Sequence, residues 1–152
     1  MRMFVAAIVL AASVQTIGAQ EFQLDRTKLY VTDPAACSAI EKKGVDAWLD
    51  MDFLSLTFDG GIQSMEFHCN FFDVKTRPNS NFSFVSAICE HPGELYPDSF
   101  AIAPYDENTI QVVSAHMNAL EMAGVFDSSE GEGASAATIY HRCDNLSEIP
   151  FD

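Results

Sequence analysis

The chain has 152 residues and a formal net charge of −14 at pH 7, with 22 acidic residues against eight basic ones. This acidic excess argues against binding to nucleic acid or to an anionic membrane surface, because both interactions depend on Lys and Arg. It favours solubility, with a cationic partner or a divalent ion as the alternative.

The first 19 residues have the three zones of a secretory signal. Arg2 supplies the positive charge, residues 3–12 are apolar without interruption, and the run Ile17-Gly18-Ala19 fits a cleavage site. The apolar run is about half as long as a bilayer-spanning helix, so an uncleaved anchor is the lesser alternative. The sequence predicts cleavage after Ala19, export to the bacterial periplasm or the medium, and one soluble domain of residues 20–152. Its core would extend from about residue 30 to 144, followed by a loose tail.

Two helices are predicted. The first covers residues 33–43, because Asp33-Pro34 is a favourable helix start and Gly44 a favourable end. A second, short helix is predicted at residues 116–123, before Gly124.

Alternating apolar and polar residues predict the strands. The clearest signal is a hairpin in which residues 54–58 and a second run up to Phe71 flank the turn Asp59-Gly60-Gly61. Residues 92–98 are predicted as a loop because of Pro92-Gly93 and Pro97-Asp98. Further strands are predicted at residues 82–89, 100–103, 110–114 and 138–143.

Together these elements predict a mainly β (α+β) domain. It would be a curled antiparallel sheet or a small barrel, with the two helices packed against it. Because the strands are short and regularly spaced, an all-β sandwich is the alternative.

Four cysteines in an exported chain predict two disulfides. We expect the pairs Cys37–Cys69 and Cys89–Cys143, which requires the last strand to run parallel to the strand that ends at Cys89. The rival scheme joins Cys69 to Cys89 and Cys37 to Cys143, and a hairpin turning near Asn79 would place the first of these pairs in direct register.

Candidate chemistry is sparse. Ser64, Glu66 and His68 fall on one face of the predicted second hairpin strand and form a polar patch. Alternate residues of a strand are about 7 Å apart, too far for a nucleophile and its base, so a solvated face is the simpler interpretation. No catalytic residue and no cofactor are therefore predicted.

Two groups of residues are candidates for metal binding. His68, His91 and His141 lie close in sequence to cysteines, but disulfide formation removes the thiolates that a Cys/His site needs. Asp127, Glu130 and Glu132 offer oxygen ligands for calcium in an acidic loop without the spacing of a calcium-binding loop motif.

Four short motifs resemble those of small exported bacterial four-cysteine proteins with no assigned activity. The motifs are residues 33–37, 61–69, 89–94 and 140–143. The resemblance implies a disulfide-stapled β domain and no functional residue. The chain is also similar in general character to periplasmic lysozyme inhibitors, but it lacks their inhibitory loop motif, so that activity is not implied.

The sequence therefore favours a non-enzymatic, exported binding protein whose partner is a protein or another envelope component. One alternative is a small hydrolase built from two of His68, His91, His116 and His141, or from one of them and a carboxylate, meeting in a concave pocket. Another is a divalent-cation-binding protein.

Overall fold

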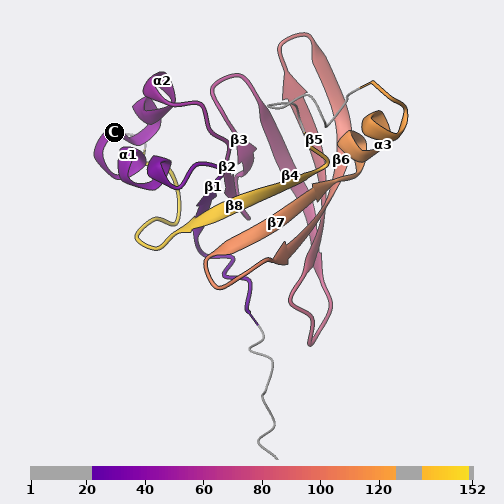
Figure 1. Ribbon diagram of the computed structural model, residues 1–152, viewed down its shortest axis with the longest axis horizontal. Helices are drawn as coiled ribbons and strands as arrows, with labels where there is room; N and C mark the ends of the chain where they lie inside the picture. Colours follow the sequence, from indigo (N-terminus) through magenta and orange to yellow (C-terminus); the bar gives the residue numbers. More distant parts are fainter. Residues whose placement is uncertain (1–21, 126–134, 151–152) are drawn as a thin grey trace, which may run out of the picture.

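Eight antiparallel strands, each hydrogen-bonded to the next along the chain, close into one barrel in the computed structural model (Figure 1). The structure describes residues 22–125 and 135–150. The strands are β1 (Leu29–Val31), β2 (Ser55–Thr57), β3 (Gly61–Gln63), β4 (His68–Thr76), β5 (Ser83–His91), β6 (Glu94–Pro104), β7 (Thr109–Ser114) and β8 (Ala137–Cys143). The helices are α1 (Ala35–Lys43), the 3-10 turn η1 (Gly44–Asp46), α2 (Ala47–Asp50) and α3 (Ala115–Met122). The predicted mainly β fold with an N-terminal and a short second helix is confirmed, and the barrel is realised rather than the sandwich.

Strand β1 was not predicted, and it closes the barrel by pairing with β2 on one side and with β8 on the other. Its three residues are all buried. Successive side chains point to opposite faces of a strand, and both faces of β1 are covered. Tyr30 packs inside the barrel, whereas Leu29 and Val31 pack outside it, beneath α1 and α2. A short strand that is apolar on both faces has no alternating pattern, which is why the sequence does not reveal it.

The molecule thus has two apolar cores. The barrel interior contains Tyr30, Leu56, Phe58, Ile62, Cys69, Val85, Ala87, Cys89, Phe100, Ile102, Ile110, Val112 and Tyr140. The outer core, between the barrel wall and the N-terminal helices, contains Leu29, Val31, Ala36, Ile40, Ala47, Phe53, Cys143 and Ile149.

Glycine is required at two close approaches of the backbone. Gly44 ends α1 with a φ of +53°, and a Cβ there would lie 2.5 Å from the carbonyl oxygen of Pro150. Gly61 has a φ of +83°, and its Cβ would lie 1.9 Å from the carbonyl oxygen of Cys69. The first contact places the C-terminal segment against the helices, and the second brings β3 against β4.

The C-terminal segment differs from the predicted loose tail. The backbone N–H of Leu29 donates to the carbonyl of Leu146 at 2.9 Å, and Ile149 is buried in the outer core. The segment is therefore packed as far as Pro150.

Two predicted elements have different boundaries. The second strand of the predicted hairpin is divided into β3 and β4 by a turn at residues 64–67, in which the N–H of Ser64 donates to the carbonyl of Phe67 at 2.7 Å. Residues 94–98, predicted as a loop, form the first half of β6. Pro97 is tolerated there because β6 pairs with β7 only from Phe100 onward, which leaves its first half at an edge.

The disulfides are Cys37–Cys143 and Cys69–Cys89, so the predicted pairing is wrong and the rival scheme is confirmed. Cys69 and Cys89 lie directly opposite each other in the β4–β5 hairpin. Strand β8 runs antiparallel to its neighbours, and its end at Cys143 lies beside Leu29, beneath the helix that bears Cys37. The prediction failed because the last strand does not run parallel to the strand that ends at Cys89: β8 pairs antiparallel with β7, directly after α3. Two disulfides fit a location outside the cytoplasm.

In residues 22–125 and 135–150, no helix combines the length and the apolar character needed to cross a membrane.

Replacing Cys37 and Cys143 together by Ala is expected to lower the free energy of unfolding by about 4 kcal/mol, because this bond closes a loop of 106 residues. Urea titration measures the change, and the far-UV circular dichroism should remain that of the barrel. Peptide mapping of the unreduced wild type provides the control on pairing. A loss below about 1 kcal/mol would show that the bond does not restrict the unfolded chain as this entropy model requires.

Candidate functional site

One end of the barrel is closed by the segment that precedes β1. Leu24 packs against the barrel core, and the guanidinium of Arg26 lies 5.7 Å from the centre of the Phe58 ring. The hydroxyl of Tyr30 donates to the carbonyl of Asp25 at 2.8 Å, which fixes the segment in place.

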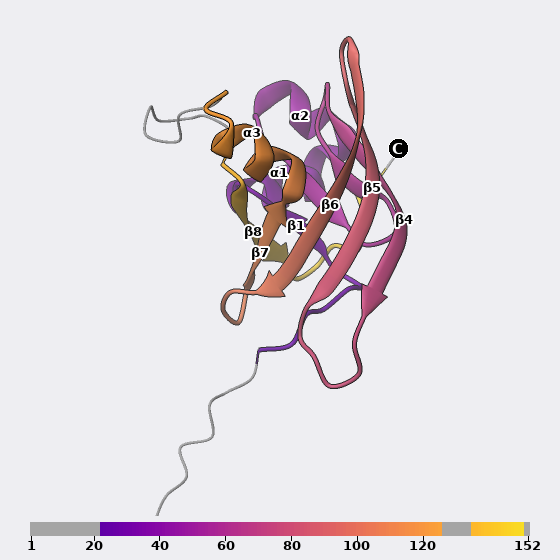
Figure 2. The same cartoon turned by 90° about the vertical axis from the view of Figure 1, so that its right-hand side faces the viewer.

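Among the described residues, the opposite end contains a cavity of about 440 Å³, here called the barrel mouth. The β5–β6 turn and α3 both lie at this end (Figure 2). Many of the lining residues are apolar and belong to the barrel core or pack against it. They are Leu54, Ile62, Phe67, His91, Glu94, Tyr96, Asp98, Phe100, Val112, Ser114, His116, Met117, Leu120, Ser135, Ala136, Thr138 and Tyr140.

The carboxylate of Asp98 anchors α3 at the rim of the mouth. Its Oδ1 accepts from the backbone N–H of Ser99 at 2.7 Å and of His116 at 2.9 Å, and its Oδ2 accepts from the hydroxyl of Ser114 at 2.5 Å. The Ser114 oxygen in turn accepts from the N–H of Met117 at 3.0 Å and caps the helix. Asp98 is thus a structural anchor, and the Ser114 hydroxyl is already engaged as both donor and acceptor.

Two aromatic side chains and a hydrogen-bonded pair form one wall of the mouth. The rings of Tyr96 and His116 stack with their centres 4.1 Å apart. Nε2 of His91 lies 2.9 Å from the Glu94 carboxylate, and its ring meets Tyr96 edge-on at 6.4 Å. Burial, followed by the nearby carboxylates of Asp98 and Glu94, raises the pKa of Tyr96. The Tyr96 hydroxyl is therefore a neutral hydrogen-bonding group at neutral pH.

Tyr140 lines the mouth from inside the barrel and is only 2% exposed. Burial raises its pKa far above the ordinary value, with no contribution from a hydrogen bond. Within the described ranges no hydrogen-bond partner meets this hydroxyl. A hydroxyl beside a cavity can bond to a ligand atom or a water molecule there.

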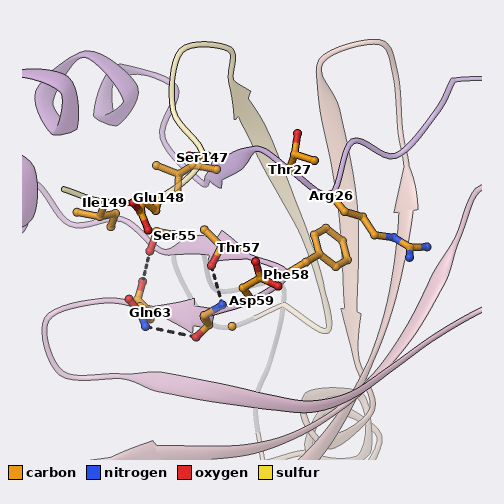
Figure 3. A pocket seen from close by; sticks show the side chains of 13 residues that line it. Arg26, Thr27, Ser55, Thr57, Phe58, Asp59, Gln63, Ser147, Glu148 and Ile149 are labelled. Carbon is orange, nitrogen blue, oxygen red and sulfur yellow. Dashed lines mark hydrogen bonds between the residues drawn. The ribbon is translucent and has the colours of Figure 1, made fainter.

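A larger cleft, of about 740 Å³, lies at the closed end, between the β2–β3 turn and the C-terminal segment (Figure 3). Three of its polar side chains hold that turn together: Thr57 Oγ1 accepts from the N–H of Gly60 at 2.9 Å, Gln63 Nε2 donates to the carbonyl of Gly60 at 3.3 Å, and Ser55 donates to the carbonyl of Gln63 at 3.3 Å. Phe58 is the one side chain of the barrel core that lines this cleft, whereas Ile62, Phe100, Val112 and Tyr140 of that core line the mouth, so we identify the barrel mouth as the candidate site.

The predicted polar patch does not share a strand face. Ser64 and Glu66 belong to the β3–β4 turn, where the Ser64 hydroxyl accepts from the N–H of Phe67 at 3.2 Å. His68 begins β4, with its Nε2 3.3 Å from the Glu90 carboxylate. The interrupting turn separates residues that a single strand would have aligned.

Of the four histidines, the structure brings His91 and His116 to the same cavity. Tyr96, Asp98 and Tyr140 were missed as site residues. The first two fall in the segment predicted as a loop, which is the first half of β6. Tyr140 could have been recognised from its place in the predicted last strand.

Among the described residues no group of three or more His, Cys, Asp and Glu side chains could hold a metal ion. The calcium candidates Asp127, Glu130 and Glu132 lie outside those residues, so that hypothesis remains a prediction.

Two Tyr-to-Phe substitutions should have different effects on stability. Tyr30→Phe removes a hydrogen bond to the Asp25 carbonyl and is expected to lower the free energy of unfolding by about 1 kcal/mol. Tyr140→Phe removes a hydroxyl that has no partner among the described residues, and it should leave the free energy of unfolding unchanged or higher. Thermal and urea unfolding of the ligand-free protein measure both, and a larger loss for Tyr140→Phe would mean that its hydroxyl has a partner in the protein.

Comparison of the chain with protein-family models, with curated proteins and with solved structures found no match, so the geometry of the chain itself is what bears on its function.

Proposed function

We propose that this protein is an exported, non-enzymatic binding protein that holds an apolar group of an envelope component in the barrel mouth. The observation that carries the proposal is the cavity at this end of the barrel, which is lined mainly by apolar and aromatic side chains, Tyr96 and Tyr140 among them. An eight-stranded barrel has an interior wide enough for packed side chains or for one small ligand. A volume of about 440 Å³ is also within the usual range of ligand pockets.

The lining residues indicate the chemistry of the ligand. Apolar side chains dominate the lining, and the stacked Tyr96 and His116 rings offer an aromatic surface. None of the lining residues given above is Lys or Arg, whereas Glu94 and Asp98 supply carboxylates. The site therefore favours a neutral or cationic group attached to an apolar body over an anionic one such as a fatty-acid carboxylate.

Export is supported by the predicted signal at residues 1–19 and by the two disulfides. The acidic charge suits a soluble carrier that must not adhere to anionic lipid.

Blocking the mouth should abolish ligand binding. Val112 and Thr138 face each other across β7 and β8, and both line the cavity. Thr138→Trp places an indole in the cavity and should weaken binding of the neutral fluorescent probe N-phenyl-1-naphthylamine at least tenfold. The matched control is Ala137→Trp, because Ala137 is exposed on the same strand and does not line the mouth.

Fluorescence titration measures the affinity of the probe, and a bound probe should also raise the thermal midpoint. If the wild type does not bind the probe, or if Thr138→Trp binds as well as Ala137→Trp, the mouth is not the binding site.

A small hydrolase is the second candidate, because the hydrogen-bonded His91–Glu94 pair and His116 line one concave pocket. Against it, the hydroxyl of Ser114, which lies two residues before His116, already donates to Asp98 and accepts from the N–H of Met117 in α3. Activation of a water by a histidine would be the remaining route.

We expect no turnover of p-nitrophenyl acetate, butyrate or octanoate that depends on these histidines. The rates of the wild type and of the His91→Ala/His116→Ala double variant should agree within a factor of two. A loss of hydrolysis in the double variant, with probe binding retained, would favour the hydrolase.

A further inference from the structure

Strand β4 has a free edge along its second half. Its first two residues, His68 and Cys69, pair with β3, whereas the ladder with β5 continues to Thr76. Among the described residues no strand pairs with the outer side of residues 72–76. In Figure 2 this stretch of β4 is the outermost strand of the β4–β5–β6 sheet.

Exposed strand edges are pairing sites that natural proteins commonly protect with charges or bulges. The bulge of β4, between Phe71 and Asp73, comes at the start of the free stretch. The charge of Lys75 is neutralised by Asp73 of the same strand, 2.8 Å away. Phe72 is 67% exposed and Val74 is 37% exposed. The edge therefore carries apolar surface and a balanced pair of charges instead of an isolated repelling lysine.

The charges of this edge are complementary to themselves in one antiparallel register. When two copies pair with Val74 opposite Val74, Asp73 of each copy lies opposite Lys75 of the other. A register centred on Asp73 or on Lys75 would instead set like charges opposite each other, which is destabilising. Opposite charges directly across a strand pair favour one register over the others.

We propose that the partner of this edge is a second copy of the chain, and that two barrels form a twofold dimer by pairing β4 with β4 around Val74. The result is a continuous six-stranded sheet, with β6, β5 and β4 contributed by each copy. A twofold axis through Val74 makes the contact isologous, so it closes at two copies instead of growing into a fibre. Arg77, just beyond β4, adds a local positive charge that limits repulsion between two acidic molecules.

The dimer is weak and reversible. A contact between two five-residue edges buries less than the roughly 1,600 Å² of a standard stable interface. It leaves the mouth free, because the residues that line the mouth do not include residues 72–76.

Sedimentation velocity of the exported wild type from about 10 μM to about 1 mM should show a rising weight-average mass that approaches that of a dimer. Lys75→Asp places only acids at positions 73 and 75, and Asp73→Lys places only lysines there. Each variant should self-associate at least tenfold more weakly than the wild type. An equimolar mixture of the two should associate as well as the wild type or better, because their edges are complementary.

The control is Lys43→Asp, which makes the same charge change in an ion pair with Asp50 on the helical segment, away from β4. It should dimerise like the wild type. Hydrogen exchange gives a second measure on unaltered protein: amides of residues 72–76 should gain protection as concentration rises.

A wild type that stays monomeric at about 1 mM without such protection overturns the proposal. So does a mixture that associates no better than its components, or a Lys43→Asp variant impaired as much as Lys75→Asp.

Discussion

The pairing of β1 with β8 closes the barrel, and both cores depend on it. β1 has only three residues, yet it supplies Tyr30 to the interior and Leu29 and Val31 to the outer core. Three residues could not hold a barrel closed through hydrogen bonds alone, since each contributes about 1 kcal/mol net. The helical segment buries the outer face of β1, and the Cys37–Cys143 bond ties that segment to the end of β8. The closure is thus secured from outside the barrel.

The cavity follows from this arrangement. With β1 held from outside, the interior does not have to be filled completely, and the plug formed by Leu24, Phe58 and Tyr30 lies at one end only. At the other end the fold leaves a space between the strands and α3. An apolar cavity is costly for an empty protein, because the surrounding side chains lose packing contacts. A ligand that fills it recovers those contacts, which is the physical basis for assigning binding to this end.

The sequence predicts most strands and both helical regions because their patterns are local. Leu56 and Phe58 alternate with polar residues, and Gly44 and Gly124 mark helix ends. It does not predict β1, whose residues are buried on both faces, nor the antiparallel pairing of β8 with β7, on which the disulfide pairing depended. The mouth as a whole was also not predicted, because its residues come from three elements, β6 (Tyr96 and Asp98), α3 (His116) and β8 (Tyr140), and only closure of the barrel brings them together.

Neither disulfide includes a residue of α3, the helix at the rim of the mouth. Cys69–Cys89 links β4 to β5 inside the barrel, and Cys37–Cys143 links the helices to β8. Helix α3 contains no buried residue and is attached to the barrel largely through Asp98 and Ser114. Elements with few buried contacts open at the lowest free-energy cost. For the binding function proposed above, displacement of α3 would let a ligand enter while both cores stay closed.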